Sequence, residues 1–92
     1  MTSITTLIRN GRIITASDDY VADVLLQDGR VHTIGQSIEV GPDVRVVDAS
    51  GLYVLPGGVD THVHLENVIG ATITTDTFAS GTKAAAFGGT TT

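Results

Sequence analysis

The sequence predicts a small all-β sandwich segment over residues 1–55, followed over residues 56–92 by the first strand–helix unit of a β/α (TIM-like) barrel. In the first part, short apolar segments alternate with turn residues at close spacing, a pattern typical of β-sandwiches and partial barrels. In the second part, an apolar segment, a polar loop, an alanine-rich segment and a β-branched run follow one another, which is the order of one parallel strand–helix–strand step. Barrels of this type take roughly 250 residues. The 92 residues are therefore expected to be the N-terminal piece of a longer protein, with Met1 as its true start.

The composition excludes several classes of function. The net charge is −5 and the five basic residues are scattered, which disfavours a nucleic acid partner because phosphate binding needs clustered Lys and Arg. No apolar run is long enough to span a bilayer, and no basic and apolar leader follows Met1. With no cysteine, a metal site would have to use histidine and carboxylate ligands. A cytoplasmic enzyme fits this composition.

The first part contains a series of short predicted strands. Asn10-Gly11 and Asp28-Gly29 are two-residue hairpin signals between apolar segments, and Ser17 begins a polar turn. The predicted strands cover residues 5–10, 12–16, 21–27, 30–35 and 44–48, and residues 52–55 lead into Pro56. About fifty residues bury too little surface to be stable alone, so this segment is expected to pack on a larger body. His32 has no evident partner and is expected to be an ordinary exposed or core histidine.

The segment Leu-Pro-Gly-Gly-Val-Asp-Thr-His-Val-His-Leu, residues 55–65, is predicted to be a buried strand. Side chains alternate between the two faces of a strand, so Asp60, His62 and His64 are expected to share one face. Two imidazoles at positions i and i+2 can reach one metal ion, and barrel enzymes place such residues at the C-terminal rim. A bare His-x-His pair is also common by chance, so structural or surface histidines remain the alternative. Asp60 is expected either to orient a histidine ring from behind or to be a solvated carboxylate.

A loop over residues 66–75 and a helix over residues 76–87 are predicted next. Thr75 or Asp76 is the predicted cap, and Gly88-Gly89 the predicted stop. A narrow stripe of mostly small residues at helical spacing would let the helix lie close against a sheet; its members are Phe78, Gly81, Thr82, Ala85 and Ala86. Because a loop at this position reaches over the site of a barrel, Leu65, Val68 and Ile69 are expected to wall the substrate pocket. Glu66 is expected to be a loop carboxylate and Lys83 a surface residue.

The segments PGGVDTHVHLE and FASGTKAAAFGGTTT resemble the hydantoinase/dihydropyrimidinase family of the amidohydrolases, and the resemblance extends over the whole chain. It implies the N-terminal part of a two-domain amidohydrolase with two zinc ions per subunit, bridged by a carboxylated lysine that lies outside this segment. His62 and His64 would bind the more buried ion, whereas Lys83 does not match the bridging lysine. The implied reaction opens hydantoins or 5,6-dihydropyrimidines to N-carbamoyl amino acids. The resemblance also implies a homotetramer. The 92-residue segment alone is expected to be inactive. Within it, only Asp60 is expected to serve catalysis, as a supporting group.

Four other interpretations remain. Dihydroorotases tend to follow the histidine pair with an arginine, and allantoinases with an acidic-Glu-Pro-Gly segment, whereas this chain has Leu-Glu-Asn-Val-Ile-Gly. Collapsin response mediator proteins share the fold and bind partners without the zinc histidines, and a free-standing β module is the last alternative. Residues 65–75 contain no Arg or Lys, which favours a neutral ring over a substrate carboxylate that would need a cationic partner.

Overall fold

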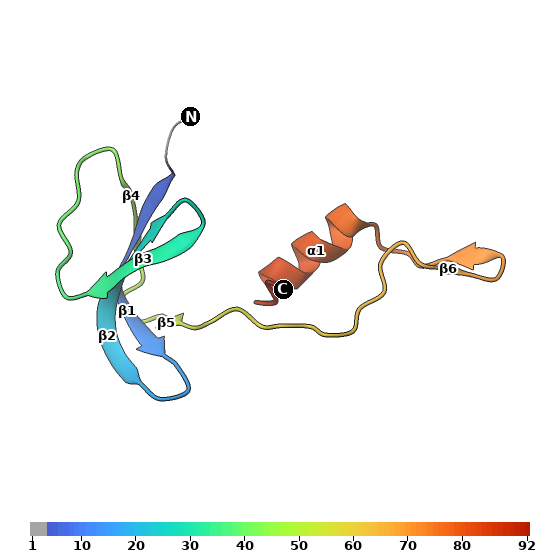
Figure 1. Cartoon of the computed structure of the whole chain (residues 1–92), viewed down its shortest axis with the longest axis horizontal. Helices are drawn as coiled ribbons and strands as arrows, with labels where there is room; N and C mark the ends of the chain where they lie inside the picture. The colour runs from blue at the N-terminus through green and yellow to red at the C-terminus, as the bar shows by residue number, and fades with distance from the viewer. Residues whose placement is uncertain (1–3) are drawn as a thin grey trace. The chain divides into compact units, whose positions relative to one another are not determined.

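The computed structural model describes residues 4–92, which divide between Leu55 and Pro56 into two compact units. The first contains five strands, and the second contains a two-stranded hairpin and a helix (Figure 1). Among residues 4–92, no helix has the length and apolar character that crossing a membrane requires.

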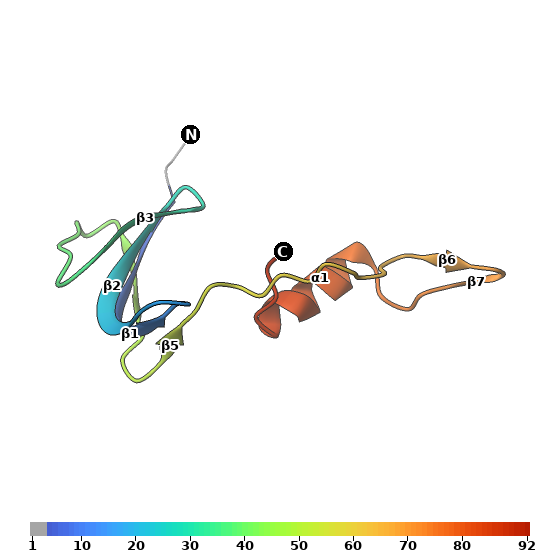
Figure 2. The same cartoon turned by 60° about the horizontal axis from the view of Figure 1, so that its bottom comes forward.

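The first unit is a single mixed sheet. Its strands are β1 (Thr5–Ile14), β2 (Asp19–Gln27), β3 (Arg30–Gly35), β4 (Arg45–Asp48) and β5 (Tyr53–Val54). The order is β3-β2-β1-β4, with β2 antiparallel to both β1 and β3, while β4 and β5 pair in parallel with β1 (Figure 2). The sequence predicted a sandwich segment, and residues 4–55 form a strand-rich single sheet, without the second sheet that a complete sandwich needs. Alternating strands show which face is apolar, but not whether the strands share one sheet or two.

The core of this sheet lies around β1, which has neighbours along both edges. Leu7 is fully buried, and Ile13, Ala22, Val24 and Ala49 are each at most 5% exposed. Large apolar side chains elsewhere on the sheet, such as Val31 and Val46, are 61% and 50% exposed. A core this small fits the expectation that about fifty residues bury little surface.

The predicted hairpin at Asn10-Gly11 is wrong, because β1 runs through both residues as one strand. Asn10 adopts a φ of 61°, and the pairing with β2 shifts between Ile8 and Gly11, which marks a β-bulge. The Asn10 amide donates to the Asp23 carboxylate at 2.9 Å, so a side chain of β2 supplies the partner that a turn would have supplied. At Gly11 a Cβ would lie 2.4 Å from Val54 Cγ2, so the glycine allows the close approach of β5.

The second hairpin is confirmed. Asp28 and Gly29 have φ values of 52° and 77°, the paired left-handed conformation of a two-residue turn that matches strand twist. β3 has the predicted bounds, and β2 begins at Asp19, two residues before the prediction. His32 in β3 is exposed, and its Nδ1 lies 2.7 Å from the Thr33 hydroxyl.

Asp23 is the one buried charged side chain among the residues described, at 2% exposure. Its two carboxylate oxygens accept from the Asn10 amide and, at 3.0 Å, from the Ile38 amide. The hydrogen bond from Asn10 lowers the pKa of Asp23 the most, with further lowering by the Ile38 amide and the Arg9 charge, while desolvation opposes them. Arg9 Nη2 also donates to the Ile38 carbonyl at 2.8 Å. These contacts attach the connection after β3 to the bulge of β1.

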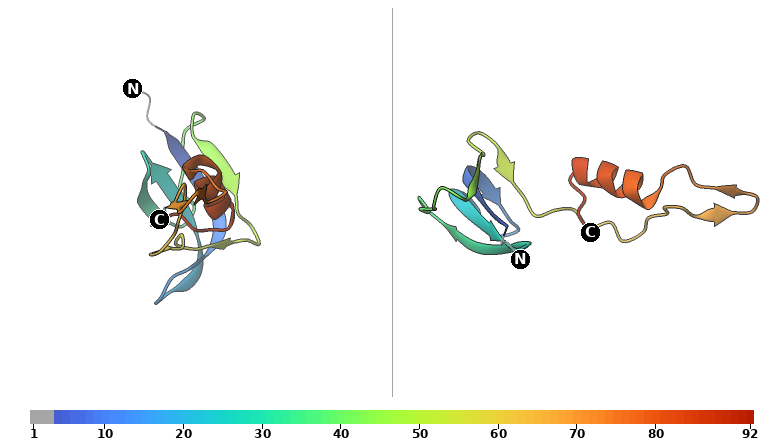
Figure 3. Two further views of the ribbon diagram at one scale, coloured as in Figure 1. Left: turned by 90° about the vertical axis from the view of Figure 1, so that its right-hand side faces the viewer. Right: turned by 90° about the horizontal axis from the view of Figure 1, so that it is seen from above.

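The second unit consists of the hairpin β6 (Val68–Ile69) and β7 (Thr72–Ile73) followed by α1 (Phe78–Phe87), as Figure 3 shows. Thr77 caps the helix: its hydroxyl accepts from the Ser80 amide, and the Ser80 hydroxyl accepts from the Thr77 amide, a reciprocal capping box. The predicted start at residue 76 and cap at Thr75 or Asp76 were therefore one to two residues early. The glycine stop is confirmed, since Gly88 is the C-cap and Gly89 has a φ of 91°.

Residues 55–65 were predicted to be a buried strand, but they form no regular strand and are largely exposed. One parallel bridge joins Gly58 to Thr90, with Gly58 N donating to Gly89 O at 2.8 Å and Asp60 N to Thr92 O at 2.7 Å. Val59 and Val63 are 67% and 60% exposed. A parallel strand is normally stabilised by neighbours on both edges and layers on both faces, whereas this segment forms backbone pairing along one edge only within residues 56–92, with residues 89–92. The parallel direction of the predicted strand–helix–strand step is nevertheless present.

Candidate functional site

His62 and His64 point their rings toward each other. Their Nε2 atoms are 2.9 Å apart, and the ring centroids are 5.0 Å apart at an interplanar angle of 45°. Both side chains are exposed. A direct hydrogen bond between the two Nε2 atoms requires one of them to carry a proton and the other to accept it. A cation shared by the two rings requires both Nε2 atoms to be unprotonated, so that each presents a lone pair. The pair is therefore arranged so that one bound species can contact both rings.

The spacing of the two nitrogens fits a zinc ion. Zn–N bonds are about 2.0–2.1 Å, so two nitrogens on one ion lie about 2.8–3.4 Å apart for bond angles from about 90° to 109°. The observed 2.9 Å lies at the short end of this range. Among residues 4–92, no group of three or more His, Asp or Glu side chains gathers closely enough to hold a metal. The pair offers two nitrogens to an ion, and a complete zinc site would need at least one more ligand.

Asp60 contacts the backbone of the pair. Its Oδ1 accepts from the His62 amide at 3.0 Å, and its own amide donates to Thr92 O at 2.7 Å. Asp60 therefore fixes the chain at His62 and links it to the segment after α1. The structure gives no hydrogen bond between this carboxylate and either imidazole.

The glycines before the pair allow the two parallel segments to approach. A Cβ on Gly57 would lie 1.9 Å from Thr91 Oγ1 and 2.8 Å from Thr91 Cβ. A Cβ on Gly58 would meet nothing closer than 3.5 Å. Gly57 is therefore required by close packing, and Gly58 is not.

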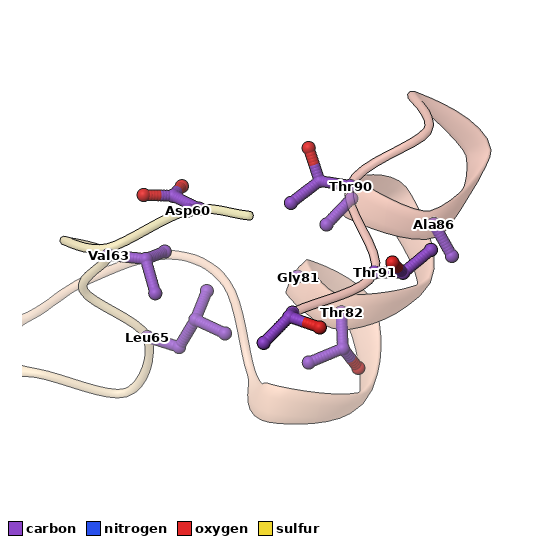
Figure 4. Close-up of a pocket in the computed structure, with 10 residues that line it drawn as sticks. Asp60, Val63, Leu65, Gly81, Thr82, Ala86, Thr90 and Thr91 are labelled. Carbon is purple, nitrogen blue, oxygen red and sulfur yellow. The ribbon is translucent and has the colours of Figure 1, made fainter. Parts of the chain in front are cut away.

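Leu65, directly after His64, packs on α1. A Cβ on Gly81 would lie 2.3 Å from Leu65 Cδ2, so the leucine methyl group occupies the space that a side chain at residue 81 would take. Figure 4 shows Val63 and Leu65 facing the helix across a hollow of about 370 Å³. The helix side of the hollow is formed by Gly81, Thr82, Ala85 and Ala86, four of the five residues of the predicted small-residue stripe. The predicted close approach of the stripe to a sheet is thus an approach to the histidine segment and to residues 90–92.

Glu66 has a role that the sequence did not reveal. Its Oε2 accepts from the Phe78 amide at 2.6 Å, and its amide donates to Asp76 O at 3.1 Å. It therefore caps the first amide of α1, where the helix dipole favours a negative charge. The contact spans twelve residues. Capping rules concern near neighbours along the chain, so no local spacing pattern points to it.

The predicted pocket loop contains the hairpin β6–β7, which Figure 3 shows continuing from the N-terminal end of α1. Its turn is Gly70-Ala71, where Gly70 has a φ of 58°. At its base, Asn67 N donates to Thr74 Oγ1 and Thr74 N to Asn67 O, both at 2.9 Å. Val68 and Ile69 are 70% and 58% exposed, so the hairpin presents apolar side chains. The β-branched residues around Gly70 were the sequence signal for a hairpin within this loop.

No family model matches the chain, but individual relatives do. It is 54% identical over 89 residues to a D-hydantoinase of Geobacillus stearothermophilus, a match that covers 97% of this chain and 19% of the relative. It is 43% identical over 89 residues to a dihydropyrimidinase of Rattus norvegicus, covering 92% of this chain and 17% of that protein. A crystal structure of a D-hydantoinase superposes with a TM-score of 0.87 at 52% identity, covering 95% of this chain and 19% of the other. The chain therefore spans about a fifth of the length of the relatives it matches.

Proposed function

Because this chain is homologous to the N-terminal portion of D-hydantoinases and dihydropyrimidinases, we propose that the protein carrying it hydrolyses cyclic amides. The substrates would be hydantoins or 5,6-dihydropyrimidines, and the products N-carbamoyl amino acids. The observation that carries the proposal is the convergence of His62 and His64, with Nε2 atoms 2.9 Å apart, in a chain about half identical to these enzymes.

In this proposal, His62 and His64 are two ligands of a zinc ion. When bound, zinc supplies a Lewis acid for the ring carbonyl and lowers the pKa of a water molecule to about 7. The remaining ligands, a second zinc ion and a carboxylated lysine that bridges the two ions would come from outside residues 1–92. Asp60 would hold His62 through its backbone amide, and no residue of this segment would transfer a proton.

The absence of cationic side chains after the pair supports a neutral substrate. Residues 65–75 contain no Arg or Lys, and Glu66 directs its carboxylate to the start of α1. A substrate carboxylate buried without a cationic partner would be costly. Dihydroorotate therefore suits this side of the site less well than dihydrouracil or a hydantoin with an apolar substituent.

The wall beside the ring substituent is assigned to Leu65, Val68 and Ile69. The exposed, apolar hairpin that carries Val68 and Ile69 supports this assignment for the two residues. Leu65 lines the hollow against α1, with its side chain packed beside Gly81.

The test compares substrates on the zinc-loaded protein that carries this sequence. Dihydrouracil, a 5-substituted hydantoin, allantoin and dihydroorotate would be assayed side by side, with His62→Ala as the control for metal-dependent turnover. Preference for dihydrouracil or the hydantoin is expected. Preference for allantoin or dihydroorotate would overturn the substrate assignment. Turnover of none of the four, with zinc bound, would overturn the proposed reaction.

A further inference from the structure

The residues that directly follow His64 are fixed to α1 at two points. Leu65 packs where Gly81 leaves room, with its Cδ2 2.3 Å from the position that a Cβ on residue 81 would take. Glu66 Oε2 accepts from the Phe78 amide at 2.6 Å, and Glu66 N donates to Asp76 O at 3.1 Å. One side chain thus packs on the small-residue face of the helix, and the next bonds to its first amide.

The backbone at Glu66 is unusual for a residue with a side chain. Its φ of 49° lies in the left-handed region, which favours glycine and is uncommon elsewhere. Such a conformation persists when the surrounding contacts determine it, and here the carboxylate and amide of Glu66 both bond to the helix start. Glu66 therefore serves as a fixed point two residues after His64.

We infer that Glu66 is a positioning residue that holds His64 in register with His62 by bonding its carboxylate to the first amide of α1. The inference rests on the proposed function, in which the two rings share a metal ion. The chain is held on both sides of His64. Before it, the Asp60 carboxylate accepts from the His62 backbone amide, and after it, the Glu66 carboxylate accepts from the first amide of α1. Groups that orient metal ligands typically change metal affinity or activity 10- to 100-fold when they are removed.

The experiment uses the protein that carries this sequence and measures zinc affinity by competition with a chelator. The absorption spectrum of the cobalt-substituted protein is recorded in parallel, because it reports ligand geometry independently of turnover. Glu66→Ala removes the acceptor and should weaken zinc binding about tenfold and change the cobalt spectrum. Glu66→Gln keeps an acceptor oxygen without the charge, so its zinc affinity and cobalt spectrum should stay closer to those of the wild type than the alanine variant's do. Glu66→Gly suits the positive φ but lacks the carboxylate, so it should weaken binding as the alanine variant does.

Two control variants isolate the contact. Asp76→Ala removes the same charge from the same helix end, where that carboxylate accepts from the Ser80 hydroxyl at 3.3 Å, and it should leave zinc affinity unchanged. Thr77→Ala removes the helix cap without touching residues 64–66 and should lower helix stability more than it lowers zinc affinity.

The outcomes separate this inference from the proposed function. Wild-type affinity and spectrum in both Glu66→Ala and Glu66→Gly, with zinc lost in His62→Ala, would overturn the positioning role and leave the metal site intact. Equal losses of zinc affinity in Glu66→Gln and Glu66→Ala would assign the effect to charge or direct ligation. A loss in Asp76→Ala equal to that in Glu66→Ala would assign it to charge, and an equal loss in Thr77→Ala would assign it to helix stability. Each of these results overturns the inference. Wild-type zinc binding in His62→Ala would instead refute the proposed metal site itself.

Discussion

Two adjacent glycines before the histidine pair should respond in opposite directions to the same substitution. Neither Gly57 nor Gly58 has a positive φ, so alanine is compatible with the backbone at both positions and only the space around the new methyl group differs. At Gly58 the nearest atoms are 3.5 Å away, an ordinary contact. At Gly57 all three heavy atoms of the Thr91 side chain lie within 2.8 Å.

The geometry at Gly57 shows why rotation of Thr91 does not remove the clash. Turning the threonine can move Oγ1 and Cγ2, which lie at 1.9 and 2.7 Å, but it leaves Cβ at 2.8 Å. The backbones must therefore separate, against the flanking hydrogen bonds of Gly58 and Asp60. Overpacking of this kind costs about 1–3 kcal/mol, and we expect Gly57→Ala to lie near 2 kcal/mol. Gly58→Ala should be neutral or should stabilise by about 0.5 kcal/mol, because alanine lowers the entropy of the unfolded chain.

The assay is native-state hydrogen exchange in the protein that carries this sequence, read at the amides of Gly58, Asp60 and Thr91. These amides join the two parallel segments, so their opening free energies report the local effect even if the whole protein does not unfold in one step. A double-mutant cycle identifies the partner. Combining Gly57→Ala with Thr91→Ala should recover part of the loss, and combining it with Thr91→Gly should recover more, because only glycine also removes the Cβ. Equal effects at Gly57 and Gly58, or no coupling to Thr91, would refute the packing argument.

Three further predictions concern the pair, the pocket and the sheet. His62→Ala or His64→Ala should remove most of the bound zinc and most of the activity, as measured by metal analysis and turnover. Asp60→Asn should have a smaller effect on both. Full zinc content in either histidine variant would show that the pair is structural. Ile69→Ala should change the preference among 5-substituted hydantoins more than it changes zinc content, and a uniform effect on all substrates would contradict a role in the substituent pocket. Asp23→Asn should destabilise the first unit at neutral pH, because an amide NH₂ would face a backbone donor at Asn10 or Ile38. The pKa of Asp23 is lower in the folded protein than its usual 3.8, so the stabilisation by this carboxylate is present above pH 3.8 and is lost as the pH falls through the folded pKa. The urea midpoints of variant and wild type should therefore converge in acid. A difference between the midpoints that does not change with pH would argue against the carboxylate.

Much of the local structure followed from local sequence signals. Asp28-Gly29, the strand at 30–35 and the glycine stop after Phe87 each depend on conformational preferences of neighbouring residues, and each was predicted correctly. The errors arose where a distant residue decides the structure. Asn10-Gly11 carries the same turn signal as Asp28-Gly29, but the Asp23 carboxylate accepts from Asn10 and β1 continues as a bulged strand. Sequence alone shows the signal and not the competing partner from another strand.

The histidine pair illustrates the same division within the candidate site. That His62 and His64 can converge follows from their i, i+2 spacing, and the rings do face each other. What holds the chain on either side of them does not follow from spacing, because the supports come from residues 78 and 81 of α1 and from residue 92 beyond it. The stripe of small residues predicted that α1 lies close to another segment, and Gly81 shows that the segment is the one carrying Leu65. Because position 81 has no side chain, the methyl groups of Leu65 occupy the space beside it, and this contact joins the histidine segment to α1.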